Sequence, residues 1–215
     1  MNKKKLLLSN CLNLALVCFS LQSCNKENAS TTPTAPVIEV GASYEGGIIA
    51  YILQPGDAGN TNAIRGIIVA PYDQGHPNNP AIYNVDWGCQ GVNCHAYASS
   101  LQSGASNTEN IIYFCNESNI AARRCADLEL NGYSDWHLPS KDELNKIYQN
   151  KSIIGGFANA VYWSSTEASV VNQNQVTYDS TRAWAQAFTN GYQFCEQKTN
   201  GPGYRVRAVR RFTIY

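Results

Sequence analysis

GYSDWHLPSKDELNKIY, from Gly132 to Tyr148, is the stretch that decides the fold of this 215-residue chain. Within it, Pro139 holds the preceding residue in an extended conformation, so no helix enters from the N-terminal side. Ser140 and Glu143 have the spacing of a capping box, in which each side chain bonds the backbone N–H of the other residue. The apolar residues that follow are three and four positions apart and share one helical face: Leu144, Ile147 and Tyr148. The stretch therefore predicts a helix that begins after Ser140 and packs against a core.

Strand and helix signals are segregated along the rest of the chain. Runs that contain β-branched or aromatic residues predict strands at residues 46–53, 65–70, 162–166, 182–188 and 204–213. Apolar spacing typical of helices occurs between them, at residues 108–115 and 120–128. Turn residues predict loops at residues 71–104, 170–180 and 189–203. This order is typical of an α+β domain with mixed or antiparallel strands, two to three helices and long loops.

The N-terminus has the pattern of a bacterial export signal. Lysines at positions 3–5 precede an apolar run over residues 6–21. The run is shorter than the roughly 20 apolar residues of a membrane span and is interrupted by polar residues. Leu21-Gln22-Ser23-Cys24 resembles a lipobox, whose cysteine is lipidated. We therefore predict a lipoprotein signal peptide over residues 1–23 and a lipid on Cys24, with secretion without a lipid as the alternative.

These N-terminal features also predict where the protein resides. Residues 24–36 are polar and have nothing to bury, which is typical of a disordered tether. The folded domain is expected over residues 37–215. We expect an exported protein held at the bacterial cell envelope by its lipid, at the outer membrane, with exposure at the cell surface and retention facing the periplasm as the two alternatives.

The charge balance excludes a dedicated nucleic-acid binder. The chain holds 16 basic and 16 acidic residues, and the first 23 residues contain three of the lysines and none of the acids. The mature chain is thus mildly acidic, whereas proteins that bind nucleic acids through their general charge are strongly basic.

The cysteines predict disulfides, because exported proteins fold in an oxidising compartment. We expect Cys89–Cys94 to close a small loop and Cys115–Cys125 to join two helical segments. The competing pattern joins Cys125 to Cys195 and leaves Cys115 free. A zinc site is not expected, because Cys89, Cys94 and a neighbouring histidine have loose spacing and no second ligand pair follows.

Catalytic patterns are missing from the sequence. The histidines His76, His95 and His137 lie outside nucleophile motifs, and Ser164-Ser165 lacks the G-x-S-x-G pattern. Asp142 and Glu143 fall in the first turn of a predicted helix, where negative charge is favoured for structural reasons. We therefore expect no catalytic residue, no metal and no cofactor.

Two groups of residues are candidates for ligand binding. Trp163 and Trp184 could stack on sugar rings or pack in the core, and Glu167 could orient a ligand or hold a loop. Arg205 and Arg207 share a strand face, and Lys198 could extend their patch. Such a patch would attract sulfated or carboxylated glycans. The alternative is a solvated face with internal ion pairs.

Four motifs together resemble one family. They are the opening stretch, YWSSTE at Tyr162–Glu167, AWAQAFTNG at Ala183–Gly191 and VRAVRRF at Val206–Phe212. In this order and spacing they resemble the DUF1566 family, also called Lcl C-terminal-like, from about residue 41 onwards. The resemblance implies a C-type-lectin-like fold, distantly similar to formylglycine-generating enzymes, in secreted or lipid-anchored proteins. It also favours anionic glycans, since the adhesin that gives the family its name binds sulfated glycosaminoglycans.

Together these features predict a non-catalytic, adhesin-like envelope protein that recognises a glycan or a surface protein. A structural component of a surface appendage or complex is the alternative. An enzyme related to the formylglycine-generating enzymes is a further one. Their chemistry uses a cysteine pair near the C-terminus, where this chain has only Cys195.

Overall fold

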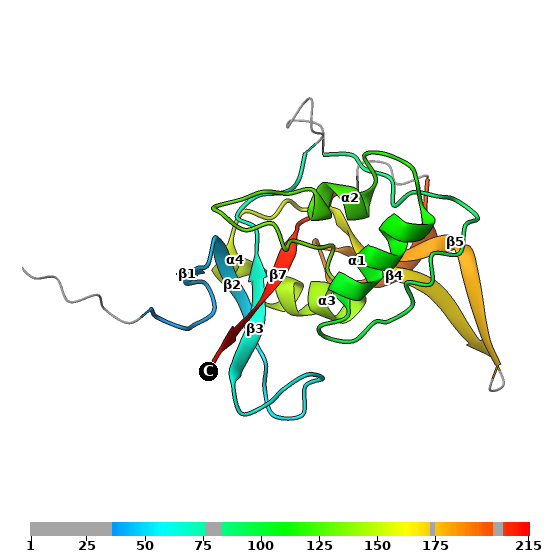
Figure 1. Ribbon diagram of the computed structural model, residues 1–215. Helices are drawn as coiled ribbons and strands as arrows, with labels where there is room; N and C mark the ends of the chain where they lie inside the picture. The colour runs from blue at the N-terminus through cyan, green and yellow to red at the C-terminus, as the bar shows by residue number, and fades with distance from the viewer. Residues whose placement is uncertain (1–35, 76–82, 173–174, 200–203) are drawn as a thin grey trace, which may run out of the picture. The chain divides into compact units, whose positions relative to one another are not determined.

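The computed structural model describes residues 36–75, 83–172, 175–199 and 204–215 (Figure 1). The predicted signal peptide and Cys24 lie outside these residues. Within the described ranges, no helix has the length and apolar character needed to cross a membrane.

Two antiparallel sheets form the frame of the domain. The first has the order β1-β2-β3-β7 and the second β4-β5-β6. In the first sheet the last strand of the chain lies beside β3, so strands from both ends of the folded part share one sheet (Figure 1). The strands are β1 Ser43–Tyr44, β2 Gly47–Ile52, β3 Ile64–Val69, β4 Val161–Asn172, β5 Gln175–Ala187, β6 Gln193–Gln197 and β7 Val209–Ile214.

Four helices connect β3 to β4 in the described residues: α1 Gly104–Phe114, α2 Ala121–Ala126, α3 Lys141–Gln149 and α4 Lys151–Ile154. The protein is thus a mixed α/β domain with antiparallel sheets. The predicted capping box is confirmed: the Ser140 side chain accepts from the Glu143 N–H, and the Glu143 carboxylate accepts from the Ser140 N–H. Leu144 and Ile147 are buried, as predicted.

The core lies where the helices and the long connections pack on the sheets. Trp87, Trp136 and Trp163 are buried in one cluster, together with Leu138. Gly66 is required where the strands meet closely, because a Cβ there would lie 2.4 Å from the Phe212 ring. Segment 83–103 has no helix or strand and wraps over this core, as the turn residues predicted.

Three boundary predictions were wrong. Strands β4 and β5 extend into residues 170–180, and β6 lies inside 189–203, although both segments were predicted to be loops. The outer hairpin pairs backbone with backbone and leaves side chains such as Tyr178 exposed, so its sequence lacks apolar alternation. The predicted strand at 204–213 begins only at residue 209. Its first part crosses between the sheets, where Arg205 bonds Val161 and Ala208 bonds Ala70.

The disulfide predictions were also wrong. Cys89 pairs with Cys115, across 26 positions of sequence, and Cys94, Cys125 and Cys195 are free thiols. The segment that follows Cys89 turns into the core, where the Cys94 backbone bonds a buried carboxylate. Cys89 itself meets the end of α1, which carries Cys115. Sequence proximity was therefore a poor guide to the pairing.

Candidate functional site

The basic patch predicted on the C-terminal strand is absent, because two of its members are buried in ion pairs. Lys198 and Glu167 are both 0% exposed, with 2.6 Å between Lys198 Nζ and Glu167 Oε1. Arg207 is 1% exposed, and its Nε lies 2.6 Å from Asp73 Oδ1. Neither cation faces a ligand. The prediction assumed a solvated strand, whereas this segment crosses the interior of the domain.

Arg205 and the two predicted tryptophans are also engaged within the domain. Arg205 Nη1 lies 2.9 Å from Asp73 Oδ2, and its guanidinium stacks 4.4 Å from the Tyr83 ring centre. Trp163 is fully buried and its Nε1 donates to a backbone carbonyl. Trp184 is half-buried, with the Lys141 ammonium 3.7 Å from its ring centre. These positions favour packing over stacking on a ligand.

Glu167 holds a loop, one of the two roles foreseen for it. Its carboxylate accepts from the backbone N–H groups of Cys94 at 3.0 Å and Ala96 at 3.1 Å. Its own N–H donates to the Ala96 carbonyl at 2.8 Å. Lys198 supplies the positive charge that a buried carboxylate needs. Because residues 94 and 96 are fixed inward, the side chains of the alternate residues lie on the outside.

Those outward side chains belong to a surface row of aromatic rings, which we call the aromatic ridge: His95, Tyr97, Tyr113, Phe114 and Tyr178. Tyr97 stacks on Tyr178 with ring centres 3.7 Å apart and 25° between the planes. His95 lies 6.1 Å from Tyr97 and 4.8 Å from Phe114. Tyr113 continues the row, 4.8 Å from Phe114. The ridge thus joins the long loop, the end of α1 and the β4–β5 hairpin.

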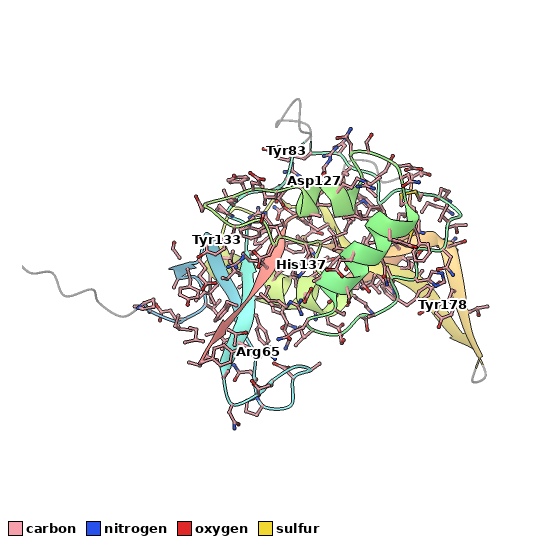
Figure 2. The ribbon with its side chains drawn as sticks, in the orientation of Figure 1. Arg65, Tyr83, Asp127, Tyr133, His137 and Tyr178 are labelled. Carbon is pink, nitrogen blue, oxygen red and sulfur yellow. A yellow bond between two sulfur atoms is a disulfide. The ribbon has the colours of Figure 1, made fainter. Side chains whose placement is uncertain are left out.

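The ridge is both accessible and firmly held. Tyr113 is 79% exposed, Tyr178 52% and Phe114 42%. Large exposed apolar patches on soluble domains commonly mark binding sites. Asn110 of α1 donates to the His95 carbonyl at 3.0 Å, and the Tyr97 hydroxyl bonds Asn93. Figure 2 shows Tyr178 on the β4–β5 hairpin, well away from Tyr83.

Sequence reasoning missed every residue of the ridge. The usable signal was the presence of large aromatic side chains in polar or turn-rich surroundings, such as His95 and Tyr97 in a loop. That signal does not indicate which of these side chains contact one another in the fold. Only the fold brings residues of three separate segments into one row.

A cavity of about 500 Å³ lies beside α2. Tyr83 and Asp127 stand at its edge (Figure 2). Its Arg123 is committed to backbone carbonyls, including that of Cys115 at 3.0 Å. The cavity offers room, but its cations are already used in holding the chain.

Burial shifts the pKa of three titratable groups in the core. His137 is 4% exposed, and burial lowers its pKa to about 4, so it is neutral and a weak base. Within the part of the chain that the structure describes, its Nε2 has no hydrogen-bond partner, and it lies 3.9 Å from Glu143 Oε2. Burial raises the pKa of Glu143 to about 7. Burial also raises the pKa of the Cys94 thiol to about 11.

One group of side chains in the described residues has the proximity of metal ligands: Cys89, Cys115 and Glu117. The two sulfur atoms are joined in the disulfide, so neither is available as a thiolate. This donor set does not suit a metal ion, because zinc and similar ions bind deprotonated thiols.

Comparison with known proteins adds one finding. A family model described as the Lcl C-terminal domain matches residues 84–210, a range that contains the whole aromatic ridge. No curated protein matches the chain.

Proposed function

This chain belongs to the Lcl C-terminal domain family, and on that premise we propose that it recognises glycans without catalysis at the bacterial cell envelope. We propose a C-type-lectin-like fold for its domain. The observation that carries the proposal is the aromatic ridge, a row of contacting rings on the surface of the matched region.

Aromatic rings suit sugars for a physical reason. A sugar ring presents a face of C–H groups, which packs on an aromatic face, and a rim of hydroxyls that needs polar partners. Tyrosine combines a flat apolar body with a polar hydroxyl. Tyr97, Tyr113 and Tyr178 supply this combination in one row.

Rigidity strengthens the case. Ordering a mobile side chain on binding costs about 0.5–1.5 kcal/mol. Tyr97 is already stacked on Tyr178, and its loop is fixed by Glu167 and by Asn110. The entropy cost of ordering these side chains on binding is therefore small, which favours recognition of a weakly binding ligand such as a sugar.

A glycan array tests the proposal. The purified protein is screened against neutral and acidic glycans, together with Tyr97→Ala and Tyr178→Ala. We expect at least about tenfold weaker binding in both variants, the loss that corresponds to about 1.4 kcal/mol. Tyr192→Ala is the matched control, because Tyr192 is 67% exposed and contacts Phe194 rather than the ridge. Silence towards all glycans, or equal binding by every variant, contradicts the proposal.

Attachment to the envelope is proposed through a lipid on Cys24. Cys24→Ala should abolish labelling with a fatty-acid analogue and release the protein from membranes. Unchanged labelling in that variant rules out the lipid at this position.

A further inference from the structure

The arginines near the C-terminus differ in how their charge is balanced. Arg205 and Arg207 share Asp73, and Arg210 contacts Asp135 at 2.6 Å and Glu45 at 2.9 Å. Arg211 is exposed, and its hydrogen bond is to the Gln102 carbonyl at 3.2 Å. In the described ranges no carboxylate lies within ion-pair distance of Arg211. Arg211 therefore has no direct ion-pair partner there.

The sheet register places a second such arginine beside it. In the antiparallel pair of β3 and β7, Ile67 faces Arg211 and Arg65 faces Thr213. Residues two apart on a strand share a face, so Arg65 and Arg211 are diagonal neighbours on one side of the sheet. Arg65 donates to Thr213 Oγ1 at 3.3 Å and to the Gly59 carbonyl at 2.9 Å. Among the residues that the structure describes, it too has no carboxylate at ion-pair distance.

A cavity of about 300 Å³ opens between them, lined by Arg65, Gln102, Arg211, Phe212 and Thr213. A guanidinium carries five N–H donors, and the bonds to neutral oxygens leave most of them uncommitted in both arginines. Two like charges held on one sheet face repel each other. A bound anion would remove that repulsion.

The nearest buried carboxylate, Glu143, acts on Arg211 only at longer range: burial has the larger effect on its pKa and raises it, whereas Arg211 lowers that pKa. Glu143 is 0% exposed and lies behind Gln102, whose N–H donates to Glu143 Oε1 at 2.8 Å. His137, on the segment packed beside β7, is neutral at pH 7 and brings no charge. The described residues therefore leave both arginines without a direct ion-pair partner at the cavity, and an anion from outside the domain could fill that place.

We infer that the cavity between Arg65 and Arg211 binds an oxyanion, a phosphate, sulfate or carboxylate group. Arginine forks bind such groups with two parallel hydrogen bonds. The Thr213 hydroxyl, which already meets Arg65, adds a third polar group at the cavity. The site lies on the first sheet, apart from the aromatic ridge, as the positions of Arg65 and Tyr178 in Figure 2 show.

Titration with inorganic phosphate, inorganic sulfate and acetate at low ionic strength tests the inference, with calorimetry and thermal unfolding as readouts. We expect saturable binding of at least one ion and a rise in unfolding temperature by mass action. Arg65→Gln/Arg211→Gln should weaken it at least about tenfold, the equivalent of about 1.4 kcal/mol. Single Arg211→Gln, at an exposed position, should weaken it while keeping the fold. Arg182→Gln is the control, because that side chain is 51% exposed and lies on the second sheet.

The outcomes separate the possible ligands and the two sites. Binding of phosphate or sulfate assigns a tetrahedral group to the natural ligand, and binding of acetate alone assigns a carboxylate. No saturable binding of any of the three ions, or equal binding by the double variant and Arg182→Gln, overturns the inference. Tyr178→Ala should bind the ion normally, and the double arginine variant should keep neutral-glycan binding. Failure of the ridge proposal therefore leaves this inference standing, and the reverse also holds.

Discussion

Glu143 and Glu167 are both completely buried, and both hold the long segment 83–103 by its backbone N–H groups. Glu167 bonds Cys94 and Ala96 in the middle of the segment, whereas Glu143 bonds Gln102 at its end. The difference is the cation. Glu167 has the Lys198 ammonium at 2.6 Å, whereas Glu143 has the neutral His137 at 3.9 Å and only a longer-range interaction with the cation of Arg211.

The comparison shows two ways to bury a carboxylate. An ion pair keeps the charge and makes each partner dependent on the other. Backbone amides and a longer-range interaction with Arg211 do not offset the loss of water, and burial raises the Glu143 pKa to about 7. Gly104 reflects the close fit at this second site, because a Cβ there would lie 2.3 Å from Glu143 Oε2. The two sites should therefore respond differently to mutation and to pH.

Removal of the Lys198 charge should have the largest effect on stability. Lys198→Met leaves the Glu167 charge buried without a partner, and we expect a loss of about 3–5 kcal/mol in the free energy of unfolding. Equilibrium denaturation with urea measures it. The double variant Lys198→Met/Glu167→Gln removes both charges and should recover part of the loss. Equal stability of the single variant and the wild type would show that the ion pair is unimportant.

Loss of the disulfide should come next. Cys89→Ser/Cys115→Ser frees a connection across 26 residues, for which chain entropy gives about 3.5 kcal/mol. The gain in mobility should affect the part of segment 83–103 held by Glu167 first, because Cys89 lies close to that part in sequence. Hydrogen exchange should therefore rise more at Cys94 and Ala96 than at Gln102. Uniform exchange along the segment would contradict this order.

A smaller, pH-dependent effect is expected at Glu143. Its folded pKa is raised from 4.5 to about 7, so the folded state binds the extra proton between these values, and stability falls as the pH rises through that window. Glu143→Gln removes this titration. It also places the glutamine NH2 group, a donor, against one backbone N–H that lost its acceptor, which costs about 2 kcal/mol in stability. We expect that cost at pH 5 and little difference from wild type at pH 8.

Urea denaturation of both proteins across this range is the measurement. The lowered pKa of His137 acts in the opposite direction, since stability is lost as the pH falls from 6.5 towards 4. It is present in both proteins and largely cancels in the difference. Glu167→Gln leaves the Lys198 charge buried without its ion-pair partner, so this variant should instead be destabilised at both pH values. A constant difference for Glu143→Gln would mean that Glu143 does not titrate in this window.

The smallest effect is expected at the helix cap. Ser140→Ala removes the cap of α3 and the bond from Ser140 Oγ to the Ser100 carbonyl at 2.8 Å, and should cost about 1 kcal/mol. Ser152→Ala is the control, because Ser152 is exposed, and it should change stability by less than about 0.5 kcal/mol. Thermal unfolding at pH 7 compares the two. Equal melting temperatures would show that the cap adds nothing measurable.

The same pair of glutamates explains what sequence could predict. Ser140 and Glu143 are three residues apart, so their partnership is local and visible as a capping box. Glu167 and Lys198 are 31 positions apart, and Arg207 and Asp73 are 134 apart, so nothing local indicated that these charges are paired. The cations were therefore assigned to a surface patch that the fold does not form.

The candidate site was harder to foresee than the fold for the same reason. Strand and helix signals depend on neighbours along the chain, and most elements were confirmed. The aromatic ridge depends on contacts between His95, Phe114 and Tyr178, which lie on three separate elements. Among the described residues, Arg211 lacks a direct ion-pair partner because the nearby carboxylates pair with other arginines. Both are properties of the assembled domain.

The grip of Glu167 on main-chain N–H groups has a consequence for evolvability. Because the carboxylate holds Cys94 and Ala96 by their amides, it places no demand on the outward side chains at positions 95 and 97. The left-handed backbone of His95, with φ of 55°, favours Gly, Asn, Asp and His at that position, so position 97 can vary more freely than position 95. The loop is thus a frame on which new specificities can be selected, or engineered, by substitution alone.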